Sequence, residues 1–338
     1  MCNISLADIV FNISYPKSNE RIDIEENFYY TEVKKISLNN DWNNLKELNL
    51  SFSLSLTELL GVKYMKRIEK IELSNCIKLK QIERLNSLKH LKSLDLTGCE
   101  SLTDFGFLNG VDSLKYLNLS FLEQFISLEF LPELMGLEEL IVSWSSSLKV
   151  VKGLERFKKL KSLDIGSCEN LESISSIENL TQLNKLDLTG CYNVKDLNPI
   201  SNLKDLKELY IWGCKGSDYS FLENLKKLIA LHISHYPGDT LNQIANMTDL
   251  QELRLSSSSI KNFNVLKPLK KLKKLILDSS ENLENLNGIE NLTKLEYLDL
   301  KGCDNLENID LVLSLKNLKE LKIDGFDEVK QALGYEAK

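Results

Sequence analysis

One phrase of nine residues returns throughout this sequence. LKSLDLTGC at residues 91–99 recurs as LNKLDLTGC at 183–191 and as LEYLDLKGC at 295–303. Phrases with the same Leu-x-x-Leu-x-Leu spacing begin at thirteen places between Leu45 and Leu318. Successive starts lie 23 residues apart seven times, then 22 apart three times, then 23 apart twice. A period this regular predicts a stack of repeats rather than one compact core.

The spacing inside each phrase predicts a short β-strand. Positions 4 and 6 are apolar and two residues apart, so both side chains point to one face of the strand, and positions 3, 5 and 7 point to the other. Later apolar residues lie three apart, as Leu171, Ile174 and Ile177 do, which is typical of a 3₁₀ or irregular segment. Stacked repeats would bury a continuous apolar side, which predicts an α/β repeat solenoid.

Position 9 of the phrase is the main place for cysteine in this chain. Six of the seven cysteines stand there, and serine fills the position in several other repeats. A small polar side chain suits a strand that turns inward, because it fills a tight space and bonds backbone groups of the loop. We therefore predict buried free thiols rather than disulfides or metal ligands. These cysteines are Cys76, Cys99, Cys168, Cys191, Cys214 and Cys303.

These phrases resemble the leucine-rich repeat family, whose pattern is LxxLxLxxCxxL. The LDLTGC form is similar to repeats of plant intracellular immune receptors, and IENLTQL (177–183) and IENLTKL (289–295) are similar to bacterial internalin repeats. The resemblance implies a curved horseshoe with a parallel β-sheet on its concave face and 3₁₀ or irregular segments on its convex face. It also implies that the concave face binds proteins and that the domain is not an enzyme.

The phrases divide the chain into three parts. Residues 1–44 are out of register with the repeats, so we predict an N-terminal cap there, with a separate small domain as the alternative. The solenoid is predicted over 45–326 and a helical C-terminal cap over 327–338, where Val329 and Leu333 lie four apart. Pro237-Gly238 predicts a loop at 236–240, which either shapes a binding site or reflects drift in a tolerant turn.

Composition narrows the classes of partner and location. The net charge of −7 disfavours a nucleic-acid or anionic-membrane binder. No apolar run approaches the length of a membrane-spanning helix, and the N-terminus lacks the basic segment of a signal peptide. We predict a cytoplasmic protein that is monomeric by itself and uses no cofactor, and secretion as an effector stays open.

Large apolar side chains gather at positions 3, 5, 7 and 8, which the solenoid would place on its concave face. Such clusters mark interaction sites, and Trp and Tyr are frequent hot spots. Tyr210 and Trp212 lie two apart on one strand and should project side by side. The alternative for Phe121 and Trp144 is local packing into the turn. The predicted partner-binding residues are Tyr210, Trp212, His232, His235, Arg254, Phe121, Ile141, Trp144, Tyr116, Asp164, Asp187 and Tyr297.

The acidic members of this set stand at position 5. Asp164 and Asp187 are joined there by Asp95 and Glu72, and the row could accept a basic segment of the partner or a cation. The alternative is ordinary solvation of a polar strand face. A metal pair of His232 and His235 is disfavoured, because residues three apart on a strand point to opposite faces and no third ligand is evident.

Three kinds of function fit the sequence to different degrees. The first is non-enzymatic protein recognition, as in a host–microbe effector or an immune-type sensor. The second is a constitutive regulatory or adaptor subunit of an enzyme such as a phosphatase or ubiquitin ligase. The third, an enzyme using the Asp and His face, is least favoured, because general acid–base chemistry needs a closed, positioned site.

Overall fold

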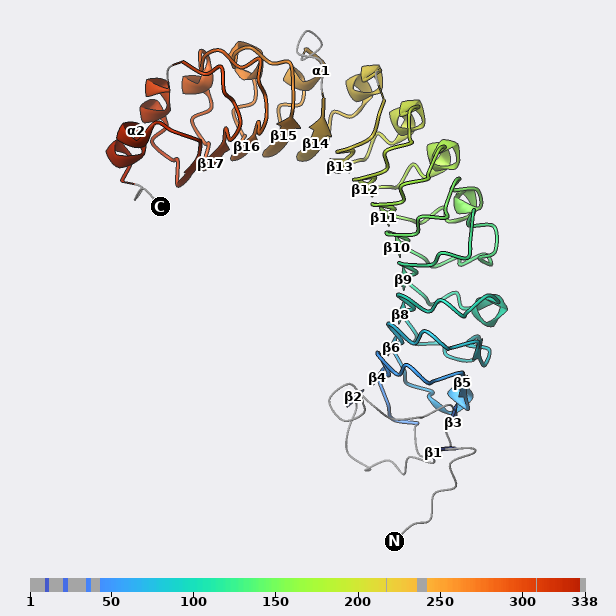
Figure 1. Ribbon diagram of the computed structural model, residues 1–338. Helices are drawn as coiled ribbons and strands as arrows, with labels where there is room; N and C mark the ends of the chain where they lie inside the picture. The colour runs from blue at the N-terminus through green and yellow to red at the C-terminus, as the bar shows by residue number, and fades with distance from the viewer. Residues whose placement is uncertain are drawn as a thin grey trace. The chain divides into compact units, whose positions relative to one another are not determined.

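The fold consists of two compact units, residues Met1–Leu183 (unit 1) and Asn184–Lys338 (unit 2). The computed structural model describes residues 10–11, 21–23, 35–37, 43–216, 218–235, 242–307 and 309–334. The predicted loop at 236–240 lies outside these residues. Within each unit the strands lie on one face of the stack and the 3₁₀ turns on the opposite face (Figure 1).

Each of the thirteen predicted phrases holds one strand, which begins at position 3. In unit 1 the strands pair in parallel and in register, so that Leu48 lies beside Ile71 and Leu94 beside Leu117. The main sheet of unit 1 contains β2 (Arg21–Asp23), β4 (Glu47–Asn49), β6 (Lys70–Glu72), β8 (Ser93–Asp95), β9 (Tyr116–Asn118), β10 (Glu139–Ile141) and β11 (Ser162–Asp164).

Unit 2 has the same pattern, with seven parallel strands among its described residues. Its central pair, β14 and β15, is longer than the others and pairs over five residues. The predicted repeat solenoid with a parallel sheet is therefore confirmed in each unit. The strands of unit 2 are β12 (Lys185–Asp187), β13 (Glu208–Tyr210), β14 (Ala230–Ser234), β15 (Glu252–Ser256), β16 (Lys274–Ile276), β17 (Tyr297–Asp299) and β18 (Glu320–Lys322).

The return segments are mostly short 3₁₀ helices, as the three-residue apolar spacing predicts. They are η2 (Val62–Tyr64), η3 (Gly106–Leu108), η4 (Leu154–Arg156) and η5 (Ser175–Asn179) in unit 1, and η6 (Asn198–Asn202), η7 (Ser220–Asn224), η9 (Asn264–Leu266), η10 (Ile289–Asn291) and η11 (Asp310–Ser314) in unit 2. The described residues of unit 2 also form two α-helices, α1 (Asn242–Ala245) and α2 (Asp327–Ala332). Helix α2 forms where the sequence predicts a helical end.

Unit 1 contains a second, smaller parallel sheet that the sequence did not predict. It joins β1 (Val10–Phe11), β3 (Lys35–Ser37), β5 (Glu58–Leu60) and β7 (Gln81–Ile82), and its last two strands lie in return segments. The segment predicted as an N-terminal cap therefore contributes strands to both sheets, since β2 pairs with β4 and β3 pairs with β5.

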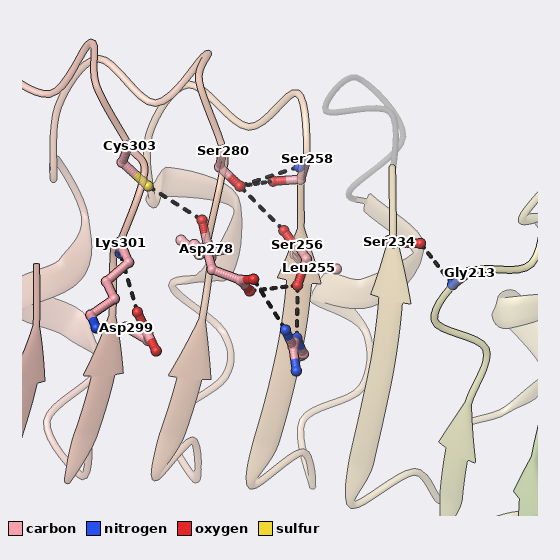
Figure 2. Close-up of polar contacts among 12 residues, drawn as sticks. Gly213, Ser234, Leu255, Ser256, Ser258, Asp278, Ser280, Asp299, Lys301 and Cys303 are labelled. Carbon is pink, nitrogen blue, oxygen red and sulfur yellow. Dashed lines mark hydrogen bonds and ion pairs between the residues drawn. The ribbon is translucent and has the colours of Figure 1, made fainter. Parts of the chain in front are cut away.

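The core is formed by the apolar ladder and closed by the position-9 residues. Leucines at positions 1, 4 and 6 are almost fully buried, and the six ladder cysteines are free and buried. The Cys168 thiol donates to the carbonyl of Val142 at 3.3 Å, and Cys303 donates to Leu277 at 3.3 Å. Ser280 takes the same place, with Oγ 3.2 Å from the Leu255 carbonyl (Figure 2). The predicted role of position 9 is thus confirmed.

Position 8 adopts a left-handed backbone in every phrase, with φ between 51° and 91°. This conformation suits glycine and asparagine and strains most other residues. Its N–H continues the ladder, as when Phe121 donates to the Ser143 carbonyl. The residues at this position are Phe52, Asn75, Gly98, Phe121, Trp144, Ser167, Gly190, Gly213, His235, Ser257, Ser279, Gly302 and Gly325.

Candidate functional site

Unit 2 brings four of the twelve predicted binding residues together on its strand face. Parallel pairing aligns Tyr210 with His232 and His232 with Arg254 at position 5 of consecutive strands. The Tyr210 and His232 rings meet edge to face, with centroids 4.7 Å apart and planes at 77°. The Arg254 guanidinium lies over the Trp212 ring, 5.8 Å from its centroid. We call these four residues, with Glu252 and Asp278, the β13–β16 cluster.

Acidic side chains hold His232 and Arg254 of this cluster in place. His232 Nε2 donates to Glu252 Oε1 at 2.9 Å, and Lys274 Nζ lies 2.9 Å from the same oxygen. Arg254 Nη2 donates to Asp278 Oδ2 at 3.0 Å and its Nε donates to Ser256 Oγ at 2.7 Å. Ser256 Oγ donates in turn to Asp278 Oδ1 at 2.5 Å, so that Ser256 and Asp278 form one network (Figure 2).

The environment of this network shifts the pKa values of its members. Burial lowers the pKa of His232 below its ordinary value and outweighs the nearby Glu252 carboxylate. Burial also raises the pKa of Tyr210, and the Glu208 carboxylate beside its hydroxyl raises it further. Burial alone would raise the pKa of Glu252, but hydrogen bonds from Lys274 and His232 hold it below its ordinary value. At neutral pH the cluster therefore presents a neutral imidazole, a neutral phenol and an ionised carboxylate.

Two hollows flank the cluster, and their linings include two further predicted residues, His235 and Tyr297. The first, of about 350 Å³, is lined by Trp212, His235, Tyr192 and Tyr219 among others. The indole Nε1 of Trp212 is buried and has no hydrogen-bond partner among the described residues. The second hollow, of about 360 Å³, is lined by residues that include Arg254, Asp278, Tyr297, Asp299 and Lys301. His235 and Tyr297 therefore lie beside the cluster and not within its hydrogen-bond network.

In unit 1 the structure brings Phe121 and Trp144 together. Their rings stack with centroids 5.8 Å apart and planes at 7°, and the side chains are 46% and 56% exposed. This exposure does not fit the alternative, in which both side chains pack into the turn. Ile141 is half-buried on β10, and Tyr116 on β9 accepts a 3.4 Å hydrogen bond from Asn118 Nδ2. Burial raises the pKa of Tyr116 above its ordinary value.

The acidic residues at position 5 have local partners. Asp95, Asp164 and Asp187 each accept a hydrogen bond of 2.8 Å from the backbone N–H two residues later, at Thr97, Gly166 and Thr189. A side-chain acceptor used in this way ends the strand in an Asx-type turn. Glu72 instead pairs with Lys70 at 2.7 Å.

The described residues contain no cluster of three His, Cys, Asp or Glu side chains that could hold a metal ion. A search of the same residues for a helix long and apolar enough to cross a membrane finds none.

Sequence reasoning missed the acidic half of the cluster. Glu252 and Asp278 stand at positions 3 and 7, in the rows that supplied the predicted aromatic residues. Their carboxylates bind His232 and Arg254 of neighbouring repeats. Comparing charges across adjacent phrases could have found them, because in-register strands place equivalent positions side by side.

Solved structures of other proteins share this fold. An internalin from Listeria monocytogenes is 21% identical with a TM-score of 0.55, over 88% of this chain and 87% of that one. The functional domain of InlJ from Listeria monocytogenes, which includes a cysteine ladder, is 19% identical with a TM-score of 0.63, over 84% of this chain and 64% of that one. A leucine-rich repeat protein of Leptospira interrogans is 22% identical with a TM-score of 0.54, over 90% of each chain.

Family models match most of the sequence. A model described as a leucine-rich repeat region matches residues 139–331, and one described as a BspA-type leucine-rich repeat region matches 9–122. No protein with a curated description matches the sequence. The first model spans more than half of the chain. Each phrase in this range forms a strand and buries its leucines. The chain therefore belongs to the leucine-rich repeat family.

Proposed function

We propose that this protein binds a protein partner through the strand face of unit 2, and that the β13–β16 cluster supplies the central contacts. One observation carries the proposal: Tyr210, Trp212 and Arg254 are held on the strand face by contacts within the protein itself. Side chains that are fixed before binding lose little entropy when a partner arrives. Aromatic residues and arginine are also the residue types that contribute most to protein interfaces.

The unpaired indole of Trp212 supports the same proposal. A buried donor without an acceptor costs about 1–3 kcal/mol of folding free energy. Residues that cost stability are retained where they serve binding. The hollow beside Trp212 provides the concave setting in which an anchor side chain of a partner can be buried.

The partner class follows from the charges around the cluster. Glu252, Asp278 and Asp299 lie among His232, Arg254, Lys274 and Lys301, so the surface carries both signs and suits a protein with a mixed surface. The fuller proposal is a recognition module of a host–microbe effector or an immune-type sensor. The second candidate is a constitutive adaptor subunit of an enzyme, since the same surface could hold the subunit on that enzyme. The prediction that the chain is not an enzyme stays a prediction.

The test is affinity capture from the native source with the wild-type chain and a Tyr210→Ser/Trp212→Ser variant. We expect one specific protein to be captured by the wild type and lost with the variant. Arg254→Met is the second variant, because it keeps the length of the side chain and removes its charge. The matched control is Leu311→Ser/Leu313→Ser, which changes two exposed apolar residues on η11 (39% and 48% exposed) and should not affect capture.

Thermal unfolding must first show that the variants are as stable as the wild type. Capture that persists with both cluster variants would place the binding surface elsewhere. A partner that co-purifies as a stable enzyme complex would favour the adaptor role, and a partner bound only on encounter would favour recognition.

A further inference from the structure

Phe121 and Trp144 occupy positions where an aromatic side chain is unfavourable for the fold. Both have left-handed backbones, with φ of 62° and 60°, and residues with a Cβ are strained there. Asn75 and Gly98 hold the same position in neighbouring phrases, and these are the residue types that fit it best. Both aromatic rings are also about half exposed. A chain that needed only this turn would not hold Phe and Trp here, so their side chains serve another purpose.

Three other aromatic rings on the strand face, those of Tyr210, Trp212 and Tyr297, have a cation from the protein itself. Lys185 lies over Tyr210 at 5.7 Å, and Arg254 lies over Trp212 at 5.8 Å. Tyr297 has Lys274 at 5.6 Å and Lys322 at 5.2 Å. In the part of the chain that the structure describes, no lysine or arginine lies over Phe121 or Trp144. Their faces are therefore open to a cation from outside the protein.

The neighbouring turns leave the outer faces of this stacked pair uncovered. Position-8 amides bond to the next phrase from Gly98 through Phe121 to Trp144, so these residues lie in register. On the outer sides of the pair the equivalent residues are Gly98 and Ser167, which are too small to cover a ring. A planar group can thus lie on the outer face of the Phe121 ring or on the outer face of the Trp144 ring.

A row of acidic residues accompanies the pair. Glu100, Glu123 and Glu169 are exposed and stand two residues after position 8 in their phrases. Glu123 is fixed at the turn that follows Trp144, because its carboxylate accepts hydrogen bonds from Ser146 Oγ at 2.6 Å and from the Ser147 N–H at 3.1 Å. The aromatic pair is therefore bordered by negative charge.

We propose that the Phe121–Trp144 stack binds an arginine side chain of a partner protein. A guanidinium is planar and weakly hydrated, so it can lie flat on an aromatic face while its N–H groups point to neighbouring carboxylates. The acidic row supplies those carboxylates. This site lies in unit 1 and does not depend on the proposed function of the β13–β16 cluster.

The experiment uses the full chain with ¹⁵N-labelled tryptophan and follows the indole N–H signals by NMR. The probes are tri-arginine amide and tri-citrulline amide, which have similar shapes but differ in charge. The signal of Trp144 is assigned by its loss in Trp144→Asn. We expect tri-arginine to shift this signal saturably, and tri-citrulline to bind at least about tenfold more weakly, a difference of about 1.4 kcal/mol.

The variants separate binding from folding. Phe121→Asn/Trp144→Asn places a residue suited to the left-handed turn at both positions, so we expect a higher unfolding temperature together with loss of tri-arginine binding. Phe52→Asn changes another position-8 aromatic of unit 1 and should leave binding unchanged. The proposal fails if the double variant unfolds at a lower temperature or binds tri-arginine as well as the wild type does. It also fails if both probes bind equally, or if neither shifts the Trp144 signal at millimolar concentration.

Discussion

The cysteine at position 9 combines packing with hydrogen bonding in one small side chain. Its thiol fills the inward turn and donates to a backbone carbonyl of the preceding repeat, as Cys76 does to Leu50 at 3.2 Å. Burial raises the pKa of Cys76 and of Cys168 to about 12, so the reactive thiolate is almost absent at neutral pH. These thiols should react with iodoacetamide only as fast as the surrounding structure opens.

The contribution of the hydrogen bond can be measured at Cys168. Cys168→Ala leaves the Val142 carbonyl buried without its donor, and we expect a loss of about 1–2 kcal/mol in the free energy of unfolding. Cys168→Ser should cost less, because Ser280 makes the equivalent bond in its own repeat. Urea unfolding of the three proteins tests this. Equal losses for Ala and Ser would mean that sulfur packing, rather than the hydrogen bond, sets the stability of the turn.

At the residue scale the sequence predicts buried positions better than backbone angles. The role of Cys168 could be predicted, because its recurrence at one position of the period implies one environment. The left-handed turns at Phe121, Trp144 and His235 could not, because these residue types disfavour that conformation. The contacts of Glu252 and Asp278 were missed because the repeat pattern shows at which position of the repeat a residue stands, but not which rotamer its side chain adopts.

At the scale of single strands, an aspartate at position 5 fixes the turn that follows its strand. Asp95 and Asp187 accept the backbone N–H two residues later, and their strands are three residues long. The two five-residue strands, β14 and β15, carry His232 and Arg254 at this position. Their pairing continues to Ser234 and Ser256. Strands β10 and β13 carry Ile141 and Tyr210 at this position and are three residues long, so the absence of such an acceptor does not by itself lengthen a strand.

The half-buried imidazole of His232 on β14 makes the stability of unit 2 depend on pH. Folding lowers the pKa of His232, so the unfolded chain binds a proton more readily than the folded chain does. The neutral His232 contributes its full stability above about pH 6.5, the ordinary pKa that the unfolded chain has. This contribution is lost as the pH falls below that value towards the lower pKa of the folded chain. We expect the unfolding temperature to fall between pH 7.5 and 5.5, and to fall less in His232→Asn. The exposed His90→Asn is the control and should show the full fall.

Close approach of backbones between repeats gives a second prediction at this scale. A Cβ on Gly136 would lie 2.1 Å from the Asp112 carbonyl oxygen of the preceding repeat. Gly136→Ala should therefore lower the free energy of unfolding by about 1–3 kcal/mol. Gly325→Ala is the comparison, because its Cβ would meet nothing within 4 Å and only the left-handed angle is strained. Calorimetry that shows Gly136→Ala to be the milder change would contradict this account.

The second sheet of unit 1 shows where sequence patterns fail for whole elements. Strands β5 and β7 lie in return segments whose apolar spacing predicts 3₁₀ turns. They form because Lys80 N–H bonds to the Thr57 carbonyl of the previous repeat at 2.9 Å. That contact joins residues 23 apart in the chain, and the spacing within one repeat does not encode it. The main strands could be predicted, because their alternation is local.

At the scale of the whole molecule, each repeat is stabilised mainly by its two neighbours. Such stacks behave as one-dimensional arrays, in which local damage spreads only to adjacent repeats. Leu140→Ala on β10 should cost about 2–5 kcal/mol locally. We expect amide hydrogen exchange to accelerate in β9, β10 and β11 and to stay unchanged in β16, β17 and β18. Uniform acceleration in all of these strands would mean that the molecule unfolds as a single cooperative body.

The left-handed turn at position 8 has an evolutionary consequence. Its backbone angle is the same whether the residue is Gly98, Ser167 or Trp144, so the path of the chain does not depend on the side chain there. A codon change at such a site alters the chemistry of one spot on the surface and leaves the neighbouring repeats in place. Natural variation can therefore revise the specificity of this protein one turn at a time, with only a modest loss of stability at each step.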